Sequence, residues 1–152
     1  MIIDAVFEYH GMGYSVIPLR TGDKVPALAS WKQYQSEPMG SGELREFWAE
    51  SPDANVAVIT GKISGVTVID IDRGGVDSLK EAGVALPKTY TVKSPHGYHY
   101  WYLYSPELKQ GSGILDGVDI RNDGGYIAAV PSRIAKCDKD WCSLPADQHI
   151  YK

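Results

Sequence analysis

The sequence is poor in cysteine and has no long apolar run. Its 152 residues include two cysteines, too few for a disulfide framework, so we expect reduced thiols and a cytoplasmic location. The longest apolar stretches lie around Val66–Ile69 and Tyr126–Val130, far short of the roughly 20 residues that cross a membrane. The first residues also lack the basic start of a signal peptide. We therefore expect no membrane partner.

Excess basic charge and the common nucleotide motifs are also missing. The chain carries 15 lysines and arginines against 19 acids, a formal net charge of −4, which disfavours a surface that grips nucleic-acid phosphates. The absence of a Walker A loop and of a Gly-x-Gly-x-x-Gly fingerprint argues against P-loop NTPases and dinucleotide enzymes. The absence of a Gly-x-Ser-x-Gly elbow leaves little support for a covalent hydrolase.

The order of apolar patterns and breakers predicts one domain of 152 residues, of the α+β or mixed α/β class. Helical spacing favours helices over 2–10, from residue 41 onward and over 78–83, and an ordered loop over 24–40. Residues 14–19, 55–60 and 65–72 have the composition of strands. We expect two hairpins, one pairing 89–93 with 98–104 and one pairing 117–120 with 126–130.

Asp70 and Asp72 end the strand pattern Val66-Thr67-Val68-Ile69-Asp70-Ile71-Asp72. Because side chains alternate along a strand, the two acids share one face, about 7 Å apart, while the isoleucines between them face the core. Two such carboxylates repel unless a cation lies between them, and Mg²⁺ or Mn²⁺ prefers oxygen ligands. The alternative is a strand end that runs into solvent, with Arg73 pairing locally.

Asp119 lies in a second apolar strand, between Val118 and Ile120. A carboxylate in that setting needs a partner. Arg121 shares its face, so a simple Asp119–Arg121 pair is one explanation. The other makes Asp119 a third metal ligand and leaves Arg121 to hold a phosphate.

His99 is the second residue of a predicted strand with aromatic residues, which follows the turn Ser94-Pro95-His96-Gly97. A histidine near metal-bound phosphates can donate a hydrogen bond to them or carry a proton. Most histidines in such strands are structural. The spacing His96-x-x-His99 suits a metal pair on a helix rather than in a hairpin, so we discount that pair.

Six segments occur in an order that is specific as a set. They are GYSVIPL followed by Lys24-x-Pro26 and Trp31, then the helix ending near Trp48, then NVAVITG, SGVTVIDID, SPHGYHYWY and GVDIRNDGGYIAAVPS. Together they resemble the N-terminal primase–polymerase (prim-pol) domain of the archaeo-eukaryotic primase superfamily, of the type found in plasmid and phage replication proteins. The resemblance implies the α+β class, with a small α/β module, about residues 1–60, an RRM-like antiparallel sheet module, about residues 61–152, and the active site between them.

The resemblance also implies roles for single residues. Asp70 and Asp72 are similar to the family's paired metal-binding acids, and Asp119 is similar to its third catalytic acid. His99 and Arg121 correspond to residues near the nucleotide phosphates. Lys24 matches a family lysine, which we also expect at the nucleotide.

The function expected from this resemblance is template-directed nucleotidyl transfer with two Mg²⁺ or Mn²⁺ ions. Deoxynucleoside triphosphates are the expected substrates, and use of ribonucleotides is left open. The partners would be a single-stranded DNA template and a primer. Trp31, Trp48, Trp101 and the tyrosines offer stacking surfaces, although we expect most of these aromatic residues to lie in the core. Two bound divalent ions would bring the net charge of −4 to about zero. A metal-dependent nuclease and a non-catalytic nucleic-acid-binding domain are the alternatives.

The end of the chain departs from the family pattern. The segment CDKDWCSLPADQH precedes Tyr151 and Lys152, where the family has a short link to a strand. Cys137, Cys142 and His149 suggest part of a zinc site, but no fourth ligand is evident, so we favour a plain insertion loop with two reduced thiols. Family members generally continue into helical and helicase regions, which we expect as partners of this domain in a longer protein.

Overall fold

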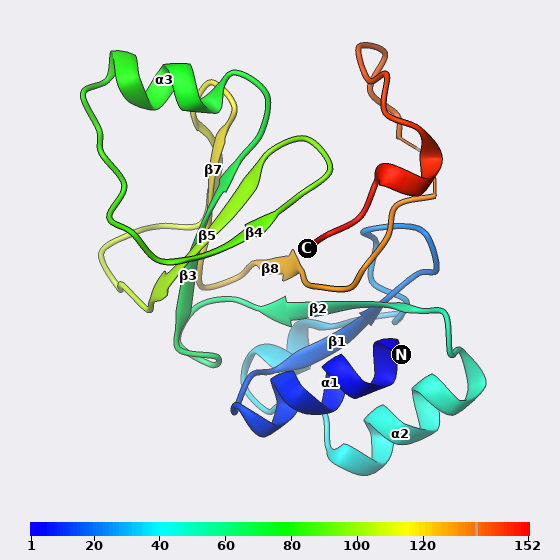
Figure 1. Ribbon diagram of the computed structural model, residues 1–152. Coiled ribbons are helices and arrows are strands. Elements are labelled where there is room, and N and C mark those ends of the chain that lie inside the picture. The colour runs from blue at the N-terminus through cyan, green and yellow to red at the C-terminus, as the bar shows by residue number, and fades with distance from the viewer. Residues whose placement is uncertain (136) are drawn as a thin grey trace.

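Two antiparallel sheets form the framework of the protein (Figure 1). The computed structural model describes residues 1–135 and 137–152. The smaller sheet has the order β1 (Val16–Leu19), β2 (Asn55–Ile59), β8 (Tyr126–Ala128). The larger sheet has the order β4 (Tyr90–Lys93), β5 (Tyr98–Leu103), β3 (Val66–Ile71), β7 (Val118–Arg121), β6 (Gly111–Leu115).

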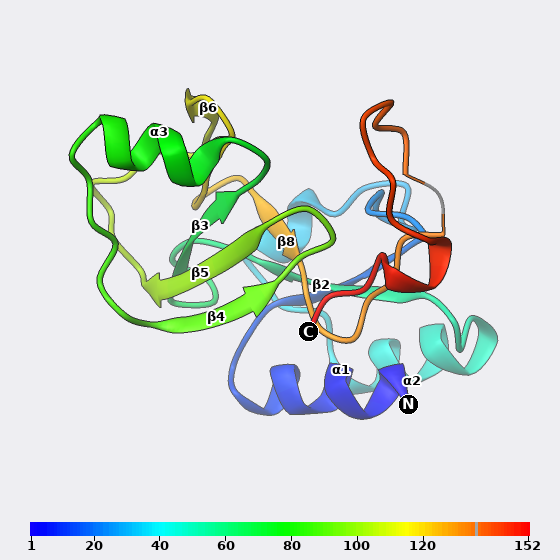
Figure 2. The same ribbon diagram turned by 45° about the horizontal axis from the view of Figure 1, so that its top comes forward.

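The helices cover the two sheets separately. Helices α1 (Ile2–Gly11) and α2 (Ser41–Glu50) lie together against the smaller sheet, whereas α3 (Gly75–Glu81) lies beside the larger one (Figures 1 and 2). Short 3-10 turns occur at Lys32–Gln35 and Ala146–Gln148. These elements confirm the α+β class. None of the helices in the described ranges is long and apolar enough to cross a membrane.

The main core lies between α1, α2 and the two sheets. All five residues of β2 are buried, as expected for a strand covered on both faces. Val6 and Trp48 contribute from the helices, and Val68 and Trp101 from the larger sheet. A smaller apolar cluster centred on Ile69, Ile71 and Val118 packs with Leu79 of α3. The central strand β3 therefore sends alternate residues into two different cores.

The hairpin predicted over 89–104 is present, but the one predicted over 117–130 is wrong. β7 pairs with β3 and β6, whereas β8 pairs with β2 in the smaller sheet. Asn122 is the physical reason: its buried side chain fixes the bend between the strands through hydrogen bonds with Thr67, Ser105 and Leu108. The chain thus crosses from one sheet to the other directly after Arg121.

Two further elements differ from what the sequence patterns predict. The third helix begins at Gly75 rather than at residue 78. β6 was not predicted, because its sequence GSGIL is dominated by glycine and serine, which have weak strand propensity.

Candidate active site

Three neighbouring strands bring the predicted acids and histidine together. In the register of the larger sheet, Asp70 on β3 lies opposite His99 on β5 and opposite Asp119 on β7. Residues directly opposite each other in an antiparallel pair have side chains on the same face. The sheet therefore aligns one histidine and two carboxylates in a row across its centre.

Because side chains alternate along a strand, this row of polar residues lies on the opposite face of the sheet from its apolar sequence neighbours. Ile69 and Ile71 flank Asp70 in sequence and belong to the apolar cluster with α3, as does Ile120 beside Asp119. The acids consequently face away from α3. This confirms the sequence prediction for the direction of the two isoleucines.

Arg121 joins the two carboxylates. Its Nη2 lies 2.8 Å from Asp119 Oδ2 and 3.7 Å from Asp70 Oδ2. The other Asp119 oxygen accepts a hydrogen bond of 2.7 Å from the Gly113 amide. The ion pair that we considered as an alternative is thus present, and it lies beside Asp70 rather than apart from it.

Burial determines the protonation states of His99 and Asp70. His99 Nε2 lies 3.4 Å from Asp70 Oδ1. Desolvation raises the pKa of Asp70 from 3.8 to about 6, against the opposing effect of Arg121. Desolvation, followed by the charges of Arg121 and Lys24, lowers the pKa of His99 from 6.5 to about 3. At neutral pH, a neutral imidazole therefore faces an ionised but poorly solvated carboxylate.

These residues border a cavity of about 880 Å³. Asp70, Asp72, His99, Arg121 and Lys24 all line it, so the cavity unites five of the six residues singled out in the sequence. The sixth, Asp119, is not among its described lining residues and reaches it through Arg121.

Lys24 approaches the cavity from the smaller sheet. It lies in the loop after β1, closed by the Leu19–Pro26 bridge. The Tyr126 hydroxyl donates a hydrogen bond of 2.9 Å to the Lys24 carbonyl oxygen, which fixes this loop over β8. Lys24 is exposed and lines the cavity from this loop, whereas Asp70 and Asp72 line it from the larger sheet.

Gly97 allows the β4–β5 turn to approach the acids. A Cβ at this position would collide with the carbonyl group of Ile71 and lie 3.1 Å from the Cα of Asp72. Only glycine permits such an approach of one backbone to another. The turn therefore lies directly against the end of β3, with His96 and His99 on either side of Gly97.

Tyr151 is a site residue that the sequence did not reveal. Its ring packs on that of His99, with centroids 5.3 Å apart, and it lines the cavity. Burial, followed by the charges of Asp70 and Asp72, raises the pKa of its hydroxyl group. No local sequence pattern marks Tyr151 as a site residue. Its position depends on a long-range backbone hydrogen bond, which the Tyr151 amide donates to the carbonyl oxygen of Ser132.

Two of the three predicted stacking tryptophans are placed in the core. Trp48 is 1% exposed and Trp101 is 6% exposed, so neither presents a ring to a nucleic-acid base. Trp31 is half-buried, lines the cavity and meets Tyr126 edge-on with centroids 5.2 Å apart. Its stacking role stays a prediction.

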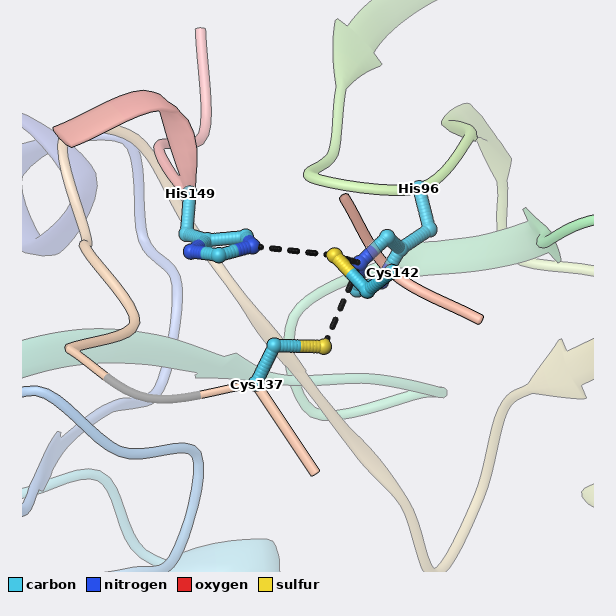
Figure 3. A group of neighbouring side chains, drawn as sticks. All are labelled: His96, Cys137, Cys142 and His149. Atoms are coloured by element: carbon cyan, nitrogen blue, oxygen red, sulfur yellow. Dashed lines mark hydrogen bonds between the residues drawn. The ribbon is translucent and has the colours of Figure 1, made fainter. Parts of the chain in front are cut away.

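A second polar cluster lies at the other side of the cavity. His96, Cys137, Cys142 and His149 place one ligand atom each within 4.8 Å of one another (Figure 3). The expectation that Cys137, Cys142 and His149 lack a fourth donor is wrong, since His96 supplies it. The four residues have the donor set of a metal site.

The two sheets and the acid-lined cavity define the class of this protein, an α+β domain with a carboxylate centre on its central strand. Residues 7–148 match the sequence model of the family described as "Bifunctional DNA primase/polymerase, N-terminal", and the chain belongs to this Prim-Pol family. A comparison with curated proteins finds no match. Membership confirms the resemblance of the sequence motifs and indicates a primase or polymerase role in replication, with nucleic acid and nucleotides as ligands.

Proposed function

We propose that this domain catalyses template-directed nucleotidyl transfer from deoxynucleoside triphosphates to a primer 3′-hydroxyl group, with Asp70, Asp72 and Asp119 holding two Mg²⁺ or Mn²⁺ ions. The observation that supports this most is the row Asp70–His99–Asp119 across three strands, beside a cavity that also contains Asp72 and Arg121. Carboxylate oxygens are the ligands that these hard cations prefer.

Two properties of these side chains support a cation-binding site. The poorly solvated Asp70 carboxylate has a raised pKa, which a divalent ion would reverse by compensating its charge. Within the described residues, buried Arg121 Nε and buried His99 Nδ1 have no hydrogen-bond partner. Buried polar atoms without a partner beside a polar cavity are costly unless a ligand satisfies them.

When bound, the divalent ions would supply charge neutralisation of the triphosphate and activation of the 3′-hydroxyl group. Arg121 would change partners, because its guanidinium group compensates the acids in their absence and can then hold phosphate oxygens. Lys24 would add a second positive charge from the loop after β1.

His99 would position the nucleotide rather than carry charge. Its lowered pKa keeps the ring neutral at pH 7, so it can donate one hydrogen bond to a phosphate oxygen. Tyr151 packs on the ring and limits its rotation. Positioning of this kind is the main protein contribution to phosphoryl-type transfer.

Primer extension tests the proposal. A labelled primer on a DNA template is incubated with Mn²⁺ or Mg²⁺ and either deoxynucleotides or ribonucleotides. We expect extension with deoxynucleotides and a loss of about 100-fold or more in Asp70→Asn and Asp119→Asn. Asp53→Asn is the matched control, because it removes the same charge from an exposed turn outside the cavity.

Two outcomes would contradict the proposal. Shortening of the labelled strand without extension would identify a nuclease that uses the same acids. Nucleic-acid binding that neither divalent ions nor Asp70→Asn affects, without any turnover, would identify a non-catalytic binding domain.

A further inference from the structure

The β4–β5 turn borders a second hollow besides the acid-lined cavity. A pocket of about 480 Å³ lies between this turn and the C-terminal segment, and we call it the turn pocket. Ser94, Pro95 and His96 line both hollows, so a ligand in one lies next to a ligand in the other. The wall of the turn pocket also contains two aromatic and two basic residues, which are Tyr98, Trp141, Arg73 and Lys93.

Two of these residues are neighbours on adjacent strands. Lys93 on β4 lies opposite Tyr98 on β5, so their side chains share one face of the larger sheet. His99 follows Tyr98 and aligns with the acids across the sheet. Because side chains alternate along a strand, Lys93 and Tyr98 lie on the other face. The turn pocket is therefore separate from the row of acids, although the same turn borders both.

Trp141 is an exposed aromatic residue in a polar segment. Every residue from Asp138 to Gln148 is exposed except Cys142, and Trp141 itself is 40% exposed, as is Tyr98. Tryptophan and tyrosine are enriched at binding surfaces, because they join a large apolar ring to a polar group. Such rings stack on the bases of single-stranded nucleic acid without regard to sequence, because every base has a π-face.

The charge of the turn pocket is positive, although the chain as a whole has a net charge of −4. Arg73 and Lys93 are exposed, and neither forms an ion pair with any residue that the structure describes. No acidic residue is among the described lining residues of the pocket. Arg73 Cζ lies 4.9 Å from the centroid of the Trp141 ring, and a stacked guanidinium group keeps the N–H donors in its plane available for phosphate oxygens. The turn pocket is thus complementary to an anionic ligand with aromatic rings.

We propose that the turn pocket binds the unpaired part of the DNA template, with a base against Trp141 and Tyr98 and phosphate groups at Arg73 and Lys93. Aromatic rings beside cations are the combination with which proteins hold single-stranded nucleic acid. Stacking on a side chain requires an unpaired base, and the template beyond the incoming nucleotide is the unpaired strand next to the cavity. The identity of the strand rests on the proposed function, whereas the binding of single-stranded DNA does not.

Fluorescence anisotropy of a labelled single-stranded oligo(dT) with the full chain, without nucleotides or added divalent ions, tests the turn pocket. Trp141→Ala should weaken binding by about tenfold, and Trp141→Phe, which keeps an aromatic ring, should restore most of the affinity. Tyr90→Ala is the matched control, because Tyr90 is 60% exposed and is not among the described lining residues of either hollow. Equal affinity of folded Trp141→Ala and the wild type would overturn the proposal.

The salt dependence of the same binding tests the two basic residues. Arg73→Gln and Lys93→Gln should each reduce the slope of log Kd against log salt concentration by about 0.7, as expected for the loss of one phosphate contact to a single strand. Lys80→Gln is the matched control, because it removes the same charge from α3, outside the pocket. An unchanged slope in both pocket variants would contradict phosphate binding at this place.

Primer extension identifies the strand. On a primed template with a long unpaired overhang, Trp141→Ala should raise KM for the primed template by about tenfold and leave KM for the nucleotide unchanged. With an overhang of one nucleotide, the variant should match the wild type. Asp70→Asn should lose extension and keep oligo(dT) binding, which separates a failure of the proposed function from a failure of the turn pocket.

A further measurement uses the wild type alone and covers the case in which a variant does not fold. Ultraviolet cross-linking to oligo(dT) should modify Trp141 or Tyr98. Cross-links confined to residues outside the turn pocket would overturn the proposal, as would the absence of oligo(dT) binding. An equal loss of affinity for free deoxythymidine triphosphate in Trp141→Ala would also overturn it, because the pocket would then hold a mononucleotide rather than a strand.

Discussion

Replacement of Asp70 by asparagine should stabilise the protein when no Mg²⁺ or Mn²⁺ is added. The Asp70 side chain is 22% exposed, and its pKa is raised from 3.8 to about 6. A carboxyl group with a raised folded-state pKa is destabilising when ionised. The native state binds its proton more tightly than the unfolded chain does, so the protein loses stability as the pH rises from about 4 to about 6.

The size of the effect follows from the two pKa values. Their difference corresponds to about 3 kcal/mol at pH 7.5, where both states are ionised. The asparagine side chain of the variant would remain neutral at every pH, and Arg121 would keep its ion pair with Asp119. We therefore expect Asp70→Asn to exceed the wild type by about 3 kcal/mol at pH 7.5 and by about 1 kcal/mol at pH 4.5.

Urea unfolding at the two pH values measures this difference, and thermal unfolding at pH 7.5 should show a rise in Tm of about 6–12 °C. Asp53→Asn, at an exposed position, should change little at either pH. A variant that is less stable than the wild type at pH 7.5 would refute the reasoning. A stabilisation that is the same at both pH values would also refute it, because a titrating carboxylate would then not be its source.

Three further predictions concern the cavity. Arg121→Lys should raise KM for the incoming nucleotide by about tenfold or more in steady-state extension, because lysine cannot make bidentate contacts; an unchanged KM would exclude Arg121 from nucleotide binding. Gly97→Ala should destabilise the protein by about 1–3 kcal/mol in urea unfolding and reduce extension, whereas Gly42→Ala, which has open space around it, should not. Extension should fall below about pH 6, where protons compete for Asp70, and more Mn²⁺ should shift that decline to lower pH; a profile insensitive to Mn²⁺ would contradict this competition.

The polar face of the site was predictable from local sequence. On β3 and β7, acids alternate with isoleucine and valine, and a strand must place such neighbours on opposite faces. The residues on either side of Asp70 accordingly pack with α3. Local alternation does not determine which strands become neighbours, however. That β8 pairs with β2 rather than with β7 depends on the long-range hydrogen bonds of Asn122.

The cluster of His96, Cys137, Cys142 and His149 shows a similar limit. Cys137, Cys142 and His149 are close in sequence, but His96 precedes the two cysteines by 41 and 46 residues. No spacing rule connects a turn residue to such distant donors, so the fourth member of the cluster emerges only from the approach of the turn to the C-terminal segment. Trp48 and Trp101 illustrate an ambiguity of residue type. An aromatic residue suits both stacking and burial, and the packing of two sheets and two helices decides between them.

The most direct test of the proposed catalytic centre is a crystal structure with Mn²⁺, a primed template and a non-hydrolysable deoxynucleoside triphosphate, with Mn²⁺ located by anomalous scattering. We expect Mn²⁺ among the carboxylates of Asp70, Asp72 and Asp119, with Arg121 turned from Asp119 to the phosphates. Mn²⁺ and triphosphate bound elsewhere, with the Arg121–Asp119 ion pair intact, would contradict the assignment of these acids.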